Sequence, residues 1–239
     1  MKLLFDDELA PITSTIGFVE ADCATVVDTF LSWQKELDRS FRKRSVIGPL
    51  KTALKTLLPL TDVGRLRYLF VPTASQWTAY FDNGWRGPDP DAVVGYLAPE
   101  RLDRRGVTID AVRHTLRRTP EGRRGRYGSV QFGLYGPEGE PPGNAIRVVY
   151  AANDGGPWEF GTFGKLLPFE NTERYMARRV KDRFTLEMLR DYLQELDIRA
   201  FEEEFYLPPD NNTAMLLERT DARLRNLNEY TLAEARAHY

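Results

Sequence analysis

The sequence predicts an α+β fold, in which a mainly antiparallel sheet of about six to seven strands is packed by helices in a single domain over residues 1–239. Segments rich in β-branched and aromatic residues follow one another through links such as GPEGEPPGN and NDGGP, which are dense in turn-forming residues. Other segments carry apolar residues at helical spacing. The strands and helices do not alternate regularly, so the pattern favours an antiparallel meander over a parallel sheet.

The first quarter of the chain predicts a strand and then two helices. Residues 12–21 are rich in β-branched side chains and predict the strand, after which Asp22 is placed to cap a helix. The apolar face of that helix consists of four residues at spacings of four, three and four, namely Val26, Phe30, Trp33 and Leu37. We expect this helix to end within residues 38–44, and a second helix to cover residues 49–58 before Pro59 closes it.

Two strands are predicted next, over residues 65–72 and 76–81. In the second strand, Trp77 and Phe81 fall on one face and Tyr80 on the other. Aromatic residues on both faces are typical of a central strand that is covered on each side, so we expect Trp77 and Phe81 to lie in the core.

The dipeptide Asn83-Gly84 normally signals a tight hairpin. Here two prolines follow at residues 88 and 90, and a proline-rich segment cannot pair as a central strand. We therefore expect a turn and a loop that lead into a short helix over residues 91–97, capped by Asp89 or Asp91.

The second half of the chain predicts more strands and then helices. The strands are expected at residues 106–112, 127–135, 145–151 and 158–166. A helical pattern covers residues 172–197, with a break near Phe184 where Thr185 could cap a new helix. Residues 201–207 predict a last short strand, and residues 212–237 predict a helix.

Composition and charge narrow the class of protein. Hydrophobic residues make up 42% of the chain and charged residues 28%, as in ordinary globular proteins. The single cysteine, Cys23, allows no internal disulfide and indicates a reducing compartment. The start, MKLLFDDELA, differs from a signal peptide, and no apolar run is long enough for a membrane helix. We expect a cytoplasmic protein with no membrane contact, and its net charge of −2 gives no general attraction to nucleic acid.

Many catalytic and cofactor sites are excluded by the residues present. The two histidines, His114 and His238, are too few for histidine-rich metal sites, so we expect no metal and no cofactor. There is no Gly-x-Ser-x-Gly motif for a serine nucleophile, and Lys165 is followed by leucine where a phosphate-binding loop needs serine or threonine. Cys23 is expected in the first turn of a helix, where it is either an activated thiol or, by preference, a buried packing residue.

Arginines form the first group of candidate binding residues. Nine lie between Arg101 and Arg126, and five of them are expected to line one hairpin, namely Arg117, Arg118, Arg123, Arg124 and Arg126. Their guanidinium groups suit an acidic protein partner. Alternatively, the hairpin is a solvated surface that pairs with acidic residues elsewhere in the chain. Nucleic acid is disfavoured, because Tyr127 is the one adjacent aromatic residue.

Carboxylates form the second group. In a strand, Glu202 and Glu204 would share one face and could bind a cation or act as an acid and base pair. Protection of a sheet edge by charge is the commoner use of such residues. Asp82, with Asp89 and Asp91, could hold a divalent metal, but turn formation and helix capping also explain all three.

The third candidate is the aromatic loop after the Asn-Gly turn. Trp85 lies next to Arg86 in a proline-rich loop, and an aromatic residue beside an arginine is the composition expected of a protein-interaction hot spot. We therefore single out Trp85 and Arg86, together with Asp82 before the turn, as candidate recognition residues. Packing of the loop is the alternative explanation.

The segments WTAYFDNGWRG, FENTERYMARRVKDRFTLEMLRDYL and EEEFY resemble pieces of stand-alone bacterial proteins of uncharacterised function. Proteins of that kind are sometimes immunity proteins paired with secreted toxins. The resemblance covers about a third of the chain and implies a protein partner such as a toxin, without assigning a site residue.

Three functions are therefore considered. The first is a non-enzymatic intracellular binding protein, most plausibly an immunity-type protein that masks a protein partner. The second is a hydrolase or transferase that uses carboxylates and arginines on a phosphorylated or sugar substrate. The third is an accessory subunit of a larger assembly. The shortage of histidine and cysteine favours the first.

Overall fold

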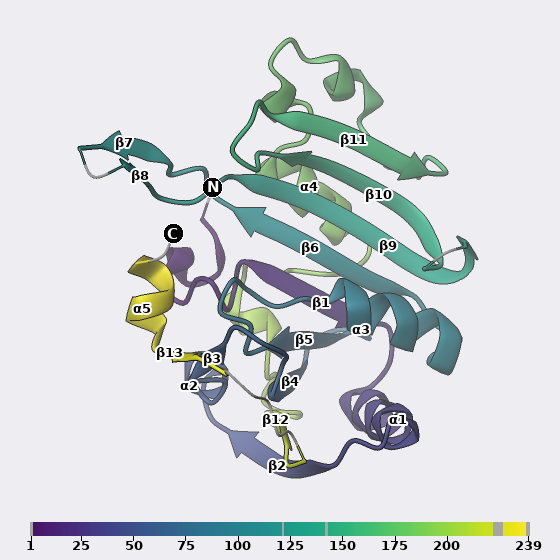
Figure 1. Cartoon of the computed structure of the whole chain (residues 1–239). Helices are drawn as coiled ribbons and strands as arrows, with labels where there is room; N and C mark the ends of the chain where they lie inside the picture. Colours follow the sequence, from purple (N-terminus) through teal and green to yellow (C-terminus); the bar gives the residue numbers. More distant parts are fainter. Residues whose placement is uncertain (1, 121, 142, 222–226, 238–239) are drawn as a thin grey trace.

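A nine-stranded sheet runs through the computed structural model, which describes residues 2–120, 122–141, 143–221 and 227–237 (Figure 1). In spatial order its strands are β11 (Glu159–Gly164), β10 (Ala145–Ala152), β9 (Ser129–Glu140), β6 (Gly106–Val112), β1 (Thr15–Val19), β5 (Thr78–Asp82), β4 (Arg67–Pro72), β12 (Thr213–Arg219) and β2 (Phe41–Ile47). Every neighbouring pair is antiparallel. The α+β prediction is thus confirmed in outline, but the sheet has nine strands and not six to seven.

Smaller elements surround this sheet. Two two-stranded sheets pair β3 (Leu60–Thr61) with β13 (Glu229–Tyr230), and β7 (Arg117–Thr119) with β8 (Gly122–Arg124). The α-helices are α1 (Cys23–Glu36), α2 (Leu50–Lys55), α3 (Asp91–Tyr96), α4 (Leu186–Gln194) and α5 (Leu232–Ala237). Short turns of 3-10 helix are η1 (Leu4–Asp7), η3 (Thr172–Met176), η4 (Val180–Asp182) and η5 (Glu203–Phe205), and η2 (Leu97–Leu102) is a π-helical turn.

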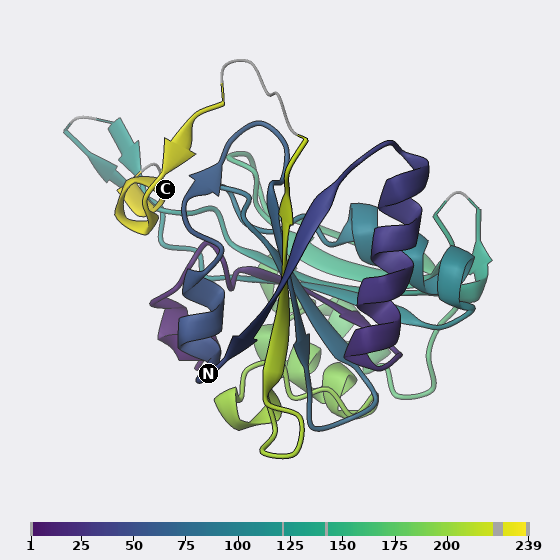
Figure 2. The same ribbon diagram turned by 90° about the horizontal axis from the view of Figure 1, so that it is seen from below.

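Helices cover both faces of the sheet (Figures 1 and 2). On one face, α1 and α3 pack on the middle strands through buried residues that include Phe30 and Val94. On the other face, α2 and α4 build a larger core that includes Leu54 and Tyr192. Beyond α3, side chains of β10 and β11 on the first face stay partly or fully exposed, as at Phe163, which is 48% exposed.

The central strand was predicted correctly. Trp77, just before β5, and Phe81, within it, are buried in the larger core, whereas Tyr80 lies in the core beneath α1 and α3. The indole Nε1 of Trp77 donates a hydrogen bond to the backbone oxygen of Leu196 at 2.8 Å, so the buried polar atom of this ring is satisfied.

The first helix was predicted correctly at its start and wrongly at its end. Asp22 caps α1 by accepting a hydrogen bond from the Thr25 amide at 3.0 Å. Leu37 lies just beyond the helix and is 47% exposed, so it does not belong to the apolar face. Residues 41–47 form the edge strand β2, which the sequence analysis missed because Arg42, Lys43 and Arg44 interrupt any alternation of apolar and polar residues.

The prediction of a helix over residues 212–237 was wrong. Residues 213–219 form β12, which inserts between β4 and β2, and among the described residues of this range the helix is α5. Met215, Leu216, Leu217 and Glu218 are good helix formers, but the two flanking strands supply backbone partners that override this local preference.

The region before β12 also differs in part. The break near Phe184 is confirmed, since Thr185 caps α4 through the Met188 amide, whereas the first part of the predicted helix consists of the turns η3 and η4. The strand predicted over residues 201–207 is wrong, because these residues contain the 3-10 turn η5. The helix α3 follows the loop as predicted, but Pro90 and not an aspartate precedes it.

No helix among the described residues has both the length and the apolar character that crossing a bilayer requires.

Candidate functional site

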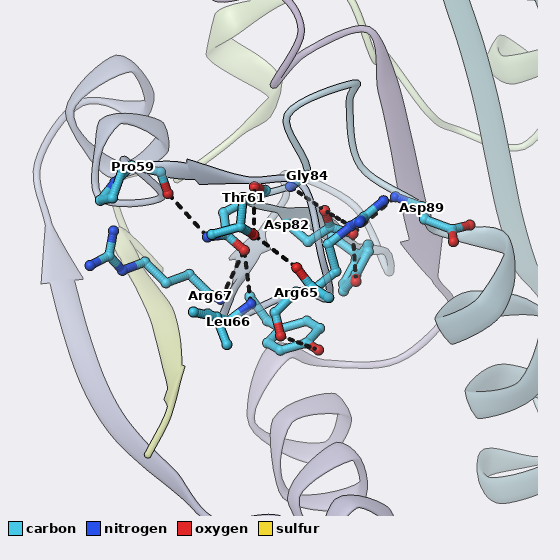
Figure 3. Close-up of polar contacts among 12 residues, drawn as sticks. Pro59, Thr61, Arg65, Leu66, Arg67, Asp82, Gly84 and Asp89 are labelled. Carbon is cyan, nitrogen blue, oxygen red and sulfur yellow. Dashed lines mark hydrogen bonds and ion pairs between the residues drawn. The ribbon is translucent and has the colours of Figure 1, made fainter. Parts of the chain in front are cut away.

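Asp82, at the end of β5, is fully buried and is held by its own loop (Figure 3). Its Oδ1 accepts from the Gly84 amide and lies 2.9 Å from Nε of Arg65. Its Oδ2 accepts from the Tyr80 hydroxyl at 3.0 Å and from the Asp89 amide at 2.9 Å. Burial raises the pKa of this carboxyl, and the Arg65 guanidinium and the two amides act in the opposite direction.

Asp82 therefore fastens the loop and does not face a ligand. All four groups that contact it belong to the protein, so its carboxylate has no open side for a metal ion or substrate. Among the described residues, no group of three histidine, cysteine, aspartate or glutamate side chains is placed to hold a metal. The alternative explanation of Asp82, turn formation, is thus the one its contacts support.

Asn83 explains why the Asn-Gly turn does not form a hairpin. Its Oδ1 accepts from the amides of Leu66 and Arg67, at 2.9 and 3.1 Å, and its Nδ2 donates to the Pro59 oxygen at 3.1 Å (Figure 3). The side chain thus replaces backbone partners for the start of β4 and holds the segment before β3. The predicted turn and loop are confirmed. Although Asn-Gly usually signals a hairpin, the Asn83 side chain here links its own loop to the start of β4 and to the segment before β3.

Trp85 and Arg86 lie where this loop meets the C-terminal segment. The indole ring of Trp85 stacks on Tyr230 with centroids 4.9 Å apart and planes 16° apart, and Trp85 packs against the larger core. The exposed Arg86 guanidinium lies 4.9 Å from the Trp85 ring. One face of the indole is thus used for packing, while recognition through Arg86 stays a prediction.

The nine arginines of residues 101–126 divide into two sets. Four of them pair with acidic residues far away in sequence: Arg101 with Glu36, Arg105 with Glu20, Arg113 with Asp6 and Arg126 with Asp7. For these four arginines, the alternative explanation, that they pair with acidic residues elsewhere in the chain, is confirmed. By contrast, Arg117 and Arg124 are exposed and form no ion pair with any described residue.

Arg117 and Arg124 belong to the hairpin of β7 and β8, which projects from the rest of the molecule at the left of Figure 1. We call this hairpin, residues 117–124, the basic arm. Its register places Arg117 opposite Arg124 and Arg118 opposite Arg123. Like charges directly opposite each other destabilise a strand pair, and an isolated two-stranded hairpin is marginally stable. The side chains of Arg118 and Arg123 lie outside the described part of the structure.

The two chain segments at the base of the arm are bonded to each other. The Thr115 amide donates to the Arg126 oxygen, and the Arg126 amide donates to the Thr115 hydroxyl, both at 3.0 Å. Gly125 has a φ of +107°, and a Cβ there would lie 2.4 Å from the Thr115 oxygen, so this close crossing requires glycine. The hairpin is thus closed at its base by Thr115, Gly125 and Arg126.

A hollow of about 340 Å³ adjoins the base of the arm and is lined by residues that include His114, Arg117, Asn153 and Trp158. The rings of His114 and Trp158 lie 5.6 Å apart. Nδ1 of His114 accepts from the Gly128 amide at 3.2 Å, which leaves its other nitrogen as a donor when the ring is neutral. The hollow combines a cation, amide groups and an aromatic face, and the arm and hollow together are the candidate site.

Sequence reasoning found the arginines of this site but missed the hollow. The sequence directs attention to His114 for metal binding or catalysis and predicts that Trp158 begins a strand. The turn NDGGP before Trp158 brings Asn153 and Gly156 to the hollow. A turn with exposed backbone polar groups next to a tryptophan is the pattern in the sequence that could have indicated this hollow.

A second hollow, of about 510 Å³, opens where β1 and β4 end and β5 begins, and its lining includes Glu20, Asp22 and Arg104. Arg105 holds Glu20 through two hydrogen bonds of 2.7 and 2.5 Å and lowers its pKa. The Thr25 hydroxyl and amide lower the pKa of Asp22. Both carboxylates thus favour the charged form and accept hydrogen bonds from other residues of the protein. A general acid must instead hold a proton, so neither carboxylate suits that role.

The remaining predicted groups are not placed for chemistry. Cys23 is buried, and burial raises the pKa of its thiol to about 12, so the packing interpretation fits and an activated thiol does not. Glu202 and Glu204 are exposed on and beside the turn η5, so they do not share the face of a strand as expected.

Asp110 on β6 gives a prediction about pH. Burial raises its pKa, with further contributions from Asp91 and Asp89, while Ser129 donates a hydrogen bond to it at 3.2 Å. A raised pKa in the folded state means that the ionised form of Asp110 is disfavoured there. The contribution of this group to the free energy of unfolding is therefore fully present below about pH 4 and is lost as the pH rises through the folded pKa. We expect Asp110→Asn to raise the melting temperature at pH 7 by about 2 °C.

The measurement is a pair of thermal unfolding curves for the native protein and Asp110→Asn, at pH 7 and at pH 4. The gain should shrink at the lower pH, because the folded and unfolded states then differ less in the protonation of the native carboxyl. An equal difference at both pH values would contradict the assignment. Asp103→Asn, at an exposed position, is the control and should change neither curve.

Comparison of the chain with known protein families, with curated proteins and with solved structures finds no match.

Proposed function

We propose that this chain is a non-enzymatic binding protein that engages an acidic segment of a protein partner through the basic arm and the hollow at its base. The arm supplies charge, and the hollow supplies an aromatic ring and hydrogen-bonding groups. This combination of arginine, tryptophan and polar groups is typical of the energetic centre of a protein interface.

The placement of Arg117 opposite Arg124 is the observation that carries the proposal. Each is exposed, and neither forms an ion pair with a described carboxylate. The fold pairs neighbouring arginines such as Arg113 and Arg126, yet keeps positive charge across from positive charge on a projecting hairpin. An anionic partner that lies along the arm and contacts the Arg117 and Arg124 side chains would relieve this repulsion and form charge-assisted hydrogen bonds.

The described carboxylates give little support to an enzyme. Asp82 is enclosed by protein donors, and the carboxylates beside the 510 Å³ hollow have lowered pKa values. An acid and base pair needs two groups whose pKa values are driven apart within reach of one substrate. Binding is therefore the better supported function.

An immunity-type role is the specific form of this proposal that the resemblance to stand-alone bacterial proteins suggests. In that form, the acidic segment belongs to a toxin that the chain masks. Electrostatic matching of this kind mainly raises the rate of association and the specificity for the partner.

The test uses a fluorescein-labelled poly-glutamate peptide as the probe, followed by fluorescence anisotropy at low salt. We expect the native chain to bind it, and the double variant Arg117→Glu with Arg124→Glu to bind on the order of 10-fold more weakly or worse. Binding should also weaken as salt is added, because exposed charges are screened.

The matched control is Arg44→Glu with Arg178→Glu, which makes the same change in net charge at exposed arginines away from the arm. This control should bind nearly as well as the native chain. Equal loss in both double variants would mean that net charge alone drives binding, and the proposal would fail. Tighter binding to duplex DNA than to the peptide would also overturn it in favour of a nucleic-acid partner.

A further inference from the structure

The two edges of the large sheet differ in how they are protected. The edge strand β2 carries Arg42, Lys43 and Arg44, and such charges discourage pairing with another strand. The opposite edge strand, β11, reads EFGTFG and has one charged residue, Glu159. It is the outermost strand at the top of Figure 1.

The backbone of β11 has groups that point outward from the sheet. The Lys165 amide donates to the Ile146 oxygen at 3.1 Å, so residue 165 bonds toward β10. Because the direction alternates along an antiparallel strand, Phe160 and Thr162 turn their N–H and C=O groups away from β10. No hydrogen bond to these four groups is found among the described residues.

The chain after β11 packs against the face of the sheet that α4 covers, and part of it loops past β11 at the top of Figure 1. Tyr175 of η3 contacts the Phe160 ring with centroids 5.1 Å apart, and the Arg183 guanidinium lies 5.9 Å from the same ring. The turn η4 contacts β10 as well as β11, which places it over the face that α4 covers. Thr162 and Phe163 remain exposed.

We infer that β11 is an interaction surface for a second copy of this chain, with the two β11 strands paired antiparallel about a twofold axis at Thr162. Thr162 then faces Thr162 of the second copy, and Phe160 faces Gly164, whose oxygen also accepts from Arg147 of its own chain. A twofold contact of this kind uses the same surface on both copies.

The side chains complement one another in this register. Glu159 falls opposite Lys165 of the second copy, and the symmetry repeats this pair of opposite charges. Phe163 falls opposite Gly161 of the second copy, where the ring of Tyr150 covers the missing side chain, so two aromatic rings meet. Phe163, which is 48% exposed in the single chain, is thereby buried.

The affinity of this contact is modest because the edge is short. It lies below the size of a standard interface, so we expect a dissociation constant on the order of 10 µM. Sedimentation of the full chain over a range of concentrations should show a monomer and a dimer in equilibrium. A chain that stays monomeric well above that concentration would overturn the inference.

Proline variants test the edge. Thr162→Pro removes an outward N–H without touching a bond to β10, so it should abolish the dimer and leave the circular dichroism spectrum unchanged. Ser45→Pro is the matched control on the other edge, since Ser45 faces away from β12 by the same alternation. A dimer that survives Thr162→Pro uses another surface, and the inference fails.

Charge variants test the register. Glu159→Lys alone and Lys165→Glu alone place like charges opposite each other and should each weaken the dimer. A mixture of the two variants restores both opposite-charge pairs and should form a mixed dimer, whereas a different register would give no recovery. The arm is not part of this contact, so Thr162→Pro should bind the poly-glutamate probe as the native chain does.

Discussion

Glu170→Ala should lower the free energy of unfolding by about 4 kcal/mol, the largest loss we expect from one substitution. The Glu170 side chain is 1% exposed and that of its partner Arg147 is 4% exposed. The guanidinium also donates to the Gly164 oxygen, and the Tyr175 hydroxyl donates to Glu170 at 2.6 Å. Removal of the carboxylate leaves a buried cation without its counter-charge, in an environment where water cannot replace it.

Urea unfolding of the native protein and of Glu170→Ala measures this loss. Glu8→Ala is the control, since Glu8 and Lys51 form an ion pair at the surface with side chains 58% and 38% exposed, and its loss should be much smaller than that of Glu170→Ala. Replacement of the pair by apolar residues, Arg147→Met with Glu170→Leu, should recover part of the loss. Equal losses for Glu170→Ala and Glu8→Ala would contradict the account.

Asp82→Ala should lower the free energy of unfolding by about 3 kcal/mol. It removes the acceptor for the Gly84 and Asp89 amides and for the Tyr80 hydroxyl, and it deprives Arg65 of its counter-charge. Part of the cost is relieved because the Arg65 side chain is 27% exposed and water can reach it. The same urea experiment measures the effect.

Asp89→Ala is the control in the same loop, because its backbone amide and not its side chain contacts Asp82. We expect this variant to differ from the native protein by less than about 0.5 kcal/mol. Asp82→Ala that is folded at low temperature should still bind the poly-glutamate probe. If it lost binding while the arm stayed intact, Asp82 would have a role in recognition beyond holding the loop.

Local patterns allowed much of the fold to be predicted. Strands β4, β5, β6, β9, β10 and β11 and the helices α1 and α3 follow from periodicity and from turn residues near their ends. Residues 213–219 and 41–47 could not be predicted in this way, because each becomes a strand through partners far away in the sequence. The strand order places β12 between β4 and β2, and no short-range signal in the sequence encodes that position.

The candidate site was predictable to a similar extent. The sequence shows the density of arginine, but the assignment of Arg105 to Glu20 and of Arg126 to Asp7 depends on contacts between residues far apart in the chain. Only when these ion pairs are known can Arg117 and Arg124 be distinguished as the arginines that are available to a partner. The sequence alone does not show that the Asp82 carboxylate is unavailable to a ligand. The groups that enclose it come from Arg65, from Tyr80 before the turn, and from the backbone after the turn, and only the fold brings them together.

The position of β12 has a consequence for how the protein is made. Leu216 pairs with Arg44 on one side and with Leu69 on the other, so β2 joins the sheet through β12, a strand that follows it far along the chain. During synthesis from the N-terminus, β4 therefore has an unfilled edge until residues 213–219 have left the ribosome. Such long-range strand pairing slows folding and prolongs the exposure of strand edges to other chains.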